Sequence, residues 1–162
     1  MLNGPIANAF IFVHEDRRDN RVSTLKQIPV PLLTEAQRTS LDQLVERYRR
    51  TAGAVDGTLE SIQVSMTRES ILRTTCLEID AIVLRGYGLP PRIERRLLDF
   101  FRGHQRRVPF SFTEYFPAEF TPAIPLWMYI SDDFRRCRAD YLMSQLPQIT
   151  DPVLVDALAE VE

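Results

Sequence analysis

Apolar residues recur along this chain at the spacing of an α-helix, and prolines interrupt that spacing at intervals. One set follows the i, i+3, i+4, i+7 pattern, which places its side chains on one helical face: Leu41, Leu44, Val45 and Tyr48. Prolines such as the pair at 90–91 end such stretches, because proline lacks the backbone donor that a helix interior needs. The pattern predicts a mainly α fold of five or six helices.

Some of the predicted helices have clearly marked ends. Thr34 and Gln37 have the spacing of a capping box, which predicts a helix from about 35 to 52. The run Thr150-Asp151-Pro152 predicts the start of a last helix, because an acidic residue and a first-turn proline both favour a helix N-terminus. The other helices are expected at about 5–14, 67–86, 91–102 and 131–146.

Two segments lack the helical period. Residues 22–30 are partly apolar and end in prolines, which predicts a short strand or extended segment near Ile28. Residues 105–129 are rich in aromatics and prolines, and we expect them to form a loop packed over the helices. The predicted organisation is an N-terminal segment, 1–33, followed by a helical domain, 34–162, that carries this loop.

Composition limits the classes of function. The net charge is −2, so DNA contact would need a local basic patch. Cys76 and Cys137 have no cysteine or histidine at metal-ligand spacing, which indicates buried thiols of a reducing compartment. No run approaches the roughly 18 apolar residues of a membrane span. We expect a cytoplasmic protein with no membrane partner and no metal site.

The common catalytic patterns are absent. An adenine methyltransferase needs a glycine-rich cofactor loop and an Asn/Asp-Pro-Pro-Tyr/Phe motif, whereas this chain has only Leu89-Pro90-Pro91-Arg92 and no glycine cluster. His14 and His104 have no recognisable nucleophile signature nearby. We therefore predict a protein without catalytic residues, cofactor or small-molecule substrate.

Metal-dependent nuclease or hydrolase chemistry is a further alternative. It needs carboxylates that converge on a metal ion, and nucleases usually add a lysine, whereas the only lysine here is Lys26. The candidate carboxylates lie in or beside the aromatic segment: Glu114, Glu119, Asp132 and Asp133. We expect them to solvate that segment or to cap the helix after Ser131.

Arginine supplies nineteen of the twenty basic side chains, and its planar guanidinium binds phosphate in a bidentate manner. The arginines form three clusters, at 17–21, 92–107 and 135–138. For the second and third clusters we favour solvated helix faces paired with acidic residues. For the first cluster, phosphate contact and solvation are both open.

Two short segments resemble parts of adenine-specific DNA methyltransferases and of type IIG and type I restriction-modification proteins. The first runs from Leu2-Asn3-Gly4-Pro5 to Ile28-Pro29-Val30-Pro31, and it resembles the end of their target-recognition domain, with Gly4 in place of the usual Ser. The second, Ile79-Asp80-Ala81-Ile82-Val83 with Tyr87-Gly88-Leu89, resembles a segment near the ends of such proteins. The two segments stand in the matching order and separation.

The resemblance implies a non-catalytic DNA-recognition or specificity fragment, with 1–33 as the end of a target-recognition-like segment. It implies DNA backbone contact by the loop that joins helix and strand, where Arg17, Arg18, Arg21 and Lys26 are the candidates. It also implies docking on a methyltransferase subunit or domain, with the chain a split subunit or a truncated remnant. The candidate docking residues are Leu41, Leu44, Val45 and Tyr48, although their spacing fits the protein's own core equally well.

A different class of function remains open. The chain can be a stand-alone helical protein-protein interaction module that does not bind DNA. In that case the arginines are solvated, and an exposed apolar stripe binds a partner helix. Salt dependence separates the two readings, because neutralising phosphates makes binding fall steeply with salt.

Overall fold

The fold is mainly helical. The computed structural model describes residues 4–14, 22–53, 62–102, 104, 115–137 and 139–160. Within these ranges the helices are α1 (Pro5–His14), α2 (Val22–Leu25), α3 (Glu35–Gly53), α4 (Ile62–Tyr87), α5 (Pro91–Phe100), α6 (Leu126–Tyr129), α7 (Asp132–Arg136), α8 (Ala139–Ser144) and α9 (Pro152–Ala159). The mainly α prediction is confirmed, but the described residues form more helices than the five or six expected.

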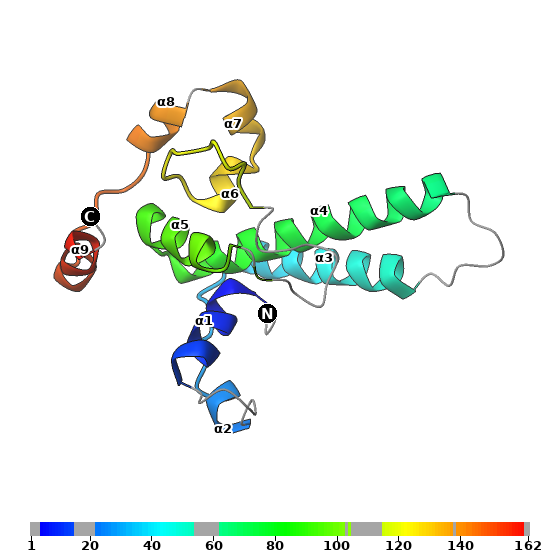
Figure 1. The fold of residues 1–162 in the computed structure, drawn as a ribbon, viewed down its shortest axis with the longest axis horizontal. Coiled ribbons are helices and arrows are strands. Elements are labelled where there is room, and N and C mark those ends of the chain that lie inside the picture. Colours follow the sequence, from blue (N-terminus) through cyan, green and yellow to red (C-terminus); the bar gives the residue numbers. More distant parts are fainter. Residues whose placement is uncertain are drawn as a thin grey trace.

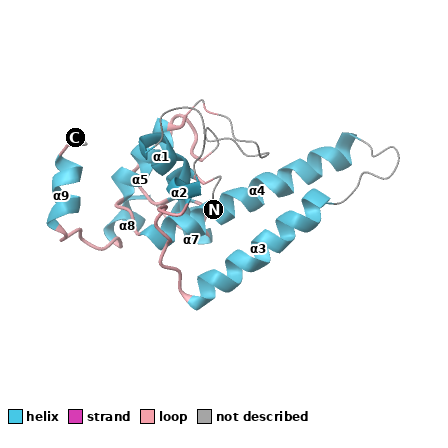
Figure 2. Ribbon diagram, turned by 90° about the horizontal axis from the view of Figure 1, so that it is seen from below, coloured by secondary structure: helices cyan, strands magenta, loops and turns pink. Residues whose placement is uncertain are grey.

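Helices α3 and α4 pack side by side as an elongated hairpin that projects from the rest of the molecule (Figures 1 and 2). The capping box at the start of α3 is present: the backbone N–H of Gln37 donates to Thr34 Oγ1 at 3.2 Å, and that of Thr34 donates to Gln37 Oε1 at 2.8 Å. At the far end, the Arg68 guanidinium donates to the carbonyls of Thr51 at 3.0 Å and Ala52 at 2.8 Å. The capping box therefore stabilises the start of α3, and the Arg68 bonds join its end to α4.

The main core lies where the C-terminal half of α4 meets α5, α6 and the residues around 115. Its largest fully enclosed side chains include Leu84 and Leu126, whereas Ile124 belongs to a second cluster with Met128 and Leu142. Four aromatic rings pack beside it in an edge-on and stacked cluster: Phe116, Phe120, Tyr129 and Phe134. The expectation that residues 105–129 pack as a loop over the helices is confirmed for residues 115–125. Residues 126–129 also pack there, but they form helix α6.

The predicted short strand or extended segment near 22–30 is wrong for its first residues. Val22–Leu25 forms the one-turn helix α2, closed by the Lys26 N–H donating to the Val22 carbonyl at 3.1 Å. Thr24 is buried, which makes this turn part of the packing. Residues 29–34 have no regular structure, and no strand occurs in the described part of the chain.

One further expectation needed correction. The helix expected from Ser131 to 146 is two helices, α7 and α8, because the chain at Cys137 is extended, with φ −117° and ψ 156°. The apolar side chains of α1 are only partly buried: Ile6 and Ala9 pack against the core, whereas Val13 is 75% exposed.

Candidate functional site

Only one of the four candidate DNA-contact residues lies in the part of the chain that the structure describes. Arg17, Arg18 and Arg21 lie outside the described residues. Lys26 directly follows α2, and its side chain is exposed. The phosphate-contact prediction therefore stays a prediction, and its described member is accessible to a ligand.

The four candidate docking residues lie on α3 at different depths. Leu41, Leu44 and Tyr48 are half-buried, and Tyr48 packs against the core cluster. Val45 is 42% exposed. Tyr48 thus serves the protein's own packing, while Val45 leaves an apolar side chain at the outer edge of the hairpin.

The two segments that carry the family resemblance are in direct contact. The Tyr87 hydroxyl donates to the Pro29 carbonyl at 2.6 Å, and the Leu32 N–H donates to the Gly86 carbonyl at 2.9 Å. Partial burial raises the pKa of the Tyr87 hydroxyl, so the hydroxyl keeps the proton that it donates. We call this contact between residues 29–33 and residues 86–87 the Pro29–Tyr87 joint.

Glycine at position 86 allows this close approach. A Cβ there would lie 2.5 Å from Leu33 Cδ2 and 2.9 Å from Pro31 Cβ, closer than unbonded carbon atoms can come. The next glycine, Gly88, has φ +62°, a left-handed conformation that ends α4 without strain only for a residue lacking Cβ. The joint and the end of α4 beside it therefore require glycine at positions 86 and 88, and an apolar residue in their place would not serve.

Asp80, the acidic residue of the second motif, has a structural role in this fold. It is buried on α4 and accepts a 2.6 Å hydrogen bond from the Tyr115 hydroxyl. This bond ties the start of the described aromatic segment to the hairpin helix. Burying both partners together satisfies the hydroxyl and at least one carboxylate oxygen away from water.

Glu94 holds the other end of the same segment. Its side chain is only 2% exposed, and it accepts a 2.6 Å hydrogen bond from the backbone N–H of Leu126, the first residue of α6. Burial raises the pKa of Glu94 to about 7, and the bond from Leu126 opposes that rise. Sequence reasoning missed this residue, because a single Glu among arginines carries no pattern that marks it as buried.

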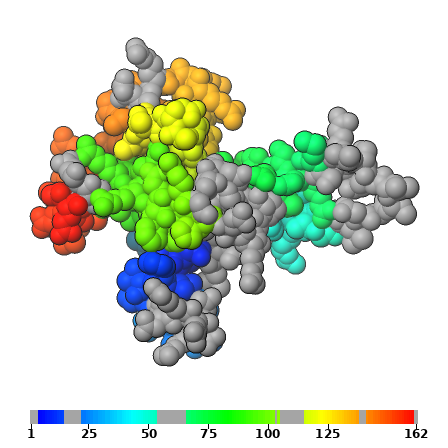
Figure 3. All heavy atoms as spheres, viewed as in Figure 1, coloured from blue at the N-terminus to red at the C-terminus, as the bar shows by residue number. Residues whose placement is uncertain are grey.

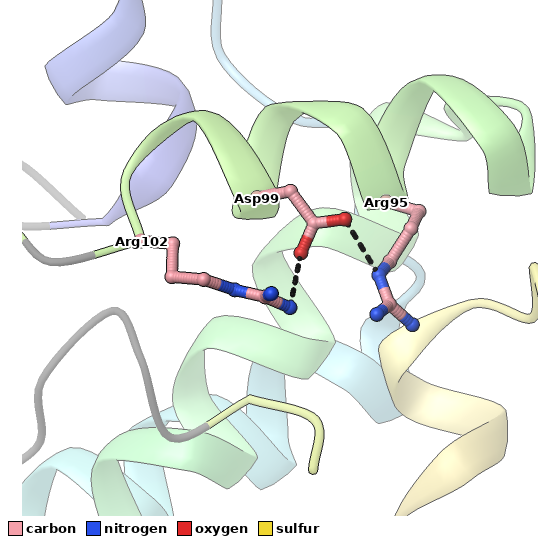
Figure 4. Close-up of polar contacts among 3 residues, drawn as sticks. All are labelled: Arg95, Asp99 and Arg102. Carbon is pink, nitrogen blue, oxygen red and sulfur yellow. Dashed lines mark hydrogen bonds and ion pairs between the residues drawn. The ribbon is translucent and has the colours of Figure 1, made fainter. Parts of the chain in front are cut away.

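The arginines of α5 mostly have partners within the protein. The Asp99 carboxylate accepts from Arg95 Nε and from Arg102 Nη2, each at 2.9 Å (Figure 4). The Arg95 guanidinium also lies over the Phe116 ring, 4.7 Å from its centroid, and its Nη1 is buried without a hydrogen-bond partner. These contacts support the expected pairing with acidic residues, but Arg95 packs against an aromatic ring instead of being solvated.

The residues considered for hydrolysis do not converge. Glu119, Asp132 and Asp133 are exposed, Asp132 pairs with Arg135 at 3.5 Å, and Glu114 lies outside the described residues. No group of three or more potential metal ligands occurs among the residues that the structure describes. His14 and His104 pack against the rings of neighbouring phenylalanines.

The cysteines and the outer face of α3 are the remaining candidates for a site. Both cysteines are free; Cys76 is buried, as expected, but Cys137 is exposed, which contradicts that expectation. An open depression of about 550 Å³ beside α3 is lined mainly by charged residues: Asp42, Gln43, Glu46, Arg47, Arg50 and Thr51. Such an open surface does not enclose a small molecule. None of the described helices has the length and apolar content needed to cross a membrane.

Comparison of the chain with family models, with curated proteins and with solved structures finds no match. The motifs and the contacts described above are therefore the basis for assigning a function.

Proposed function

We propose that this chain is a non-catalytic DNA-recognition or specificity unit of a restriction-modification system with an adenine methyltransferase. It contacts the DNA backbone through Arg17, Arg18, Arg21 and Lys26 and docks on the methyltransferase. The observation that supports this proposal is the Pro29–Tyr87 joint. Two segments that resemble separate parts of the same proteins meet through the Tyr87–Pro29 hydrogen bond. The adjoining residues Leu32 and Gly86 add a second hydrogen bond and a glycine without room for a side chain.

Backbone contact is assigned to the residues that lead into this joint. Lys26 is exposed and lies three residues before Pro29, and the arginines at 17, 18 and 21 precede it in the chain. With a net charge of −2, attraction to DNA must come from such a local group. Each phosphate neutralised by these side chains releases counterions, so binding should weaken steeply with salt.

Docking is assigned to the outer edge of α3. Val45 is exposed there, and Leu41 and Leu44 are half-buried beside it at helical spacing. The pairing of α3 with α4 makes this edge part of a supported hairpin. A supported helix loses little conformational entropy when a partner covers it.

The DNA part is tested by fluorescence anisotropy with a labelled duplex at about 50 and 200 mM salt. The variant Arg17→Ala/Arg18→Ala/Arg21→Ala should bind more weakly than the wild type and with a smaller salt slope. The control Arg135→Ala/Arg136→Ala/Arg138→Ala removes the same charge and should bind as the wild type does. Wild-type affinity no tighter than about millimolar at low salt, unchanged by the first triple substitution, would rule out DNA binding.

The docking part is tested by size-exclusion chromatography with light scattering, using a co-expressed adenine methyltransferase subunit from the same source. We expect a defined complex that Val45→Asp weakens. Met66→Asp, which changes an exposed apolar residue on α4, is the matched control. If the two proteins elute separately, the docking proposal fails.

The second candidate is a helical protein-interaction module that does not bind DNA. The observation that favours it is the number of large apolar side chains exposed on α1, α5 and α9, since such patches mark interaction surfaces. Complexes held by such a surface change little with salt, whereas DNA complexes weaken steeply. The salt titration therefore separates the two candidates.

A further inference from the structure

An exposed aromatic patch spans α1 and α5. The rings of Phe12 and Phe100 meet edge to face with centroids 5.3 Å apart, yet Phe12 is 66% exposed and Phe100 52%. Val13, next to Phe12, is also exposed. We call Phe12, Val13 and Phe100 the α1–α5 patch. The two helices are adjacent in space, as the blue and yellow-green atoms of Figure 3 show.

Basic side chains predominate beside this patch. Arg96 precedes Phe100 by one helical turn, which places it next to the ring on the helix surface. The exposed charged side chains of α5 and the residues after it are Arg92, Arg96, Asp99 and Arg102. Asp99 pairs with Arg102 at 2.9 Å, and Arg92 lies two helical turns from Phe100. The set still carries more positive than negative charge, so the α5 side of the patch suits an apolar surface with acidic flanks.

Helix α9 has the complementary character. It is eight residues long, and Val153 and Val155 are exposed while Leu154 and Leu158 are half-buried. Helices shorter than about 12 residues are marginal in water on their own, so α9 needs a surface to cover its apolar residues. Figures 1 and 2 place α9 at the edge of the molecule, apart from α1.

The charges of α9 are also complementary to those of the patch. Asp151 caps the helix, and Asp156 and Glu160 follow, whereas no lysine, arginine or histidine occurs between residues 147 and 162. An apolar helix with only acidic charges thus stands at one edge of the molecule. An apolar patch with a mainly basic rim stands at another.

We propose that the α1–α5 patch of one molecule binds helix α9 of a second copy of this chain. Because α9 and the patch lie apart within one molecule, a twofold-symmetric dimer can form both contacts reciprocally, each copy giving its α9 to the other. This inference is independent of the proposed DNA function, since neither surface contains the residues assigned to DNA.

The test is sedimentation velocity of the full-length chain over a concentration series. The wild type should form a dimer. Phe12→Asp in the patch and Val153→Asp in α9 should each weaken the dimer at least about tenfold, because each places a charge in an apolar contact. The control Met66→Asp changes an equally exposed apolar residue on α4 and should leave the dimer intact.

Mixing the variants distinguishes the modes of association. In a mixture of Phe12→Asp and Val153→Asp chains, one native contact can still form. The Val153→Asp chain has an unmodified patch, and the Phe12→Asp chain has an unmodified α9 that can bind it. The mixture should therefore recover dimers that neither variant forms alone. A dimer weakened by Phe12→Asp but not by Val153→Asp would show patch-to-patch contact and overturn the proposal, as would a wild type that stays monomeric. Circular dichroism of each variant verifies that it is folded.

Discussion

The α3–α4 hairpin and the core around α5 and α6 are stabilised in different ways. The residues of α3 include no fully buried side chain, and much of its order is local: a capping box, the Glu46–Arg50 ion pair at 2.8 Å and the Arg68 bonds to its C-terminal carbonyls. The core, by contrast, is stabilised by enclosed side chains and by hydrogen bonds that the carboxylates of Asp80 and Glu94 accept from residues distant in the sequence. Helix α3 should tolerate substitution well, and the core should not.

The largest expected effect comes from truncating side chains in the two regions. Leu126→Ala removes a fully buried core side chain and should lower the free energy of unfolding by about 3 kcal/mol. Leu44→Ala removes a half-buried side chain from α3 and should cost about 1 kcal/mol. Urea unfolding followed by circular dichroism measures both. Equal costs would show that the hairpin is packed as tightly as the core.

The pH dependence of stability should reveal the buried carboxyl of the core. The pKa of Glu94 is raised from 4.5 to about 7, so the folded protein keeps a proton that the unfolded chain releases. Stability should therefore fall as pH rises from about 4.5 to 7, by roughly 3 kcal/mol, and be fully retained only below this range.

The variant Glu94→Gln isolates this contribution, because Gln keeps an oxygen for the Leu126 N–H and does not titrate. Its stability should lack that fall with pH. The control Glu119→Gln, at an exposed residue of the same segment, should keep the wild-type slope. Parallel pH profiles for wild type and Glu94→Gln would contradict the assignment.

Substitutions at two glycines, one in a tight contact and one in open space, also test this contrast. Gly86→Ala forces a Cβ against Leu33 and Pro31 and should cost about 2 kcal/mol of stability. Gly53→Ala, at the last residue of α3, meets nothing within 4 Å and should raise stability by up to about 1 kcal/mol, since Ala favours the helix. The two thermal midpoints should move in opposite directions, and a shared direction would argue against the Pro29–Tyr87 joint.

The smallest effect is expected at the cap of α3. Thr34→Ala removes the hydroxyl that accepts from the Gln37 N–H and should cost about 1 kcal/mol. Thr39→Ala, at an exposed position inside α3, loses no cap and should cost nothing. Helical content measured during urea unfolding compares them, and an equal loss in both would show that the cap does not stabilise the hairpin.

The same contrast explains which parts of the fold could be predicted from the sequence. The starts of α3 and α9 were predictable because capping residues act on N–H groups two or three positions away, as Asp151 does by accepting from Val153 at 2.9 Å. The hairpin helices follow from apolar spacing in the same way. These signals lie within a few residues of the structure that they determine.

The features that were missed depend on distant residues. Helix α6 lies in a segment without a period, and its first N–H is bonded by Glu94, 32 residues earlier. The turn of α2 lies in a β-branched segment that predicted a strand, and the burial of Thr24 accompanies the helical turn instead. The motif residues Tyr87 and Asp80 could be singled out from the sequence, but their partners, Pro29 and Tyr115, could not.

The bonds from Arg68 to Thr51 and Ala52 also make the hairpin a practical site for protein engineering. Because α3 and α4 are joined by these side-chain bonds and by their packing, the covalent link between Gly53 and Ile62 is not needed to align them. A fluorescent protein inserted there, or new chain termini created there by circular permutation, should leave the core intact. Such a fusion would place a reporter at the end of the hairpin, away from the α1–α5 patch.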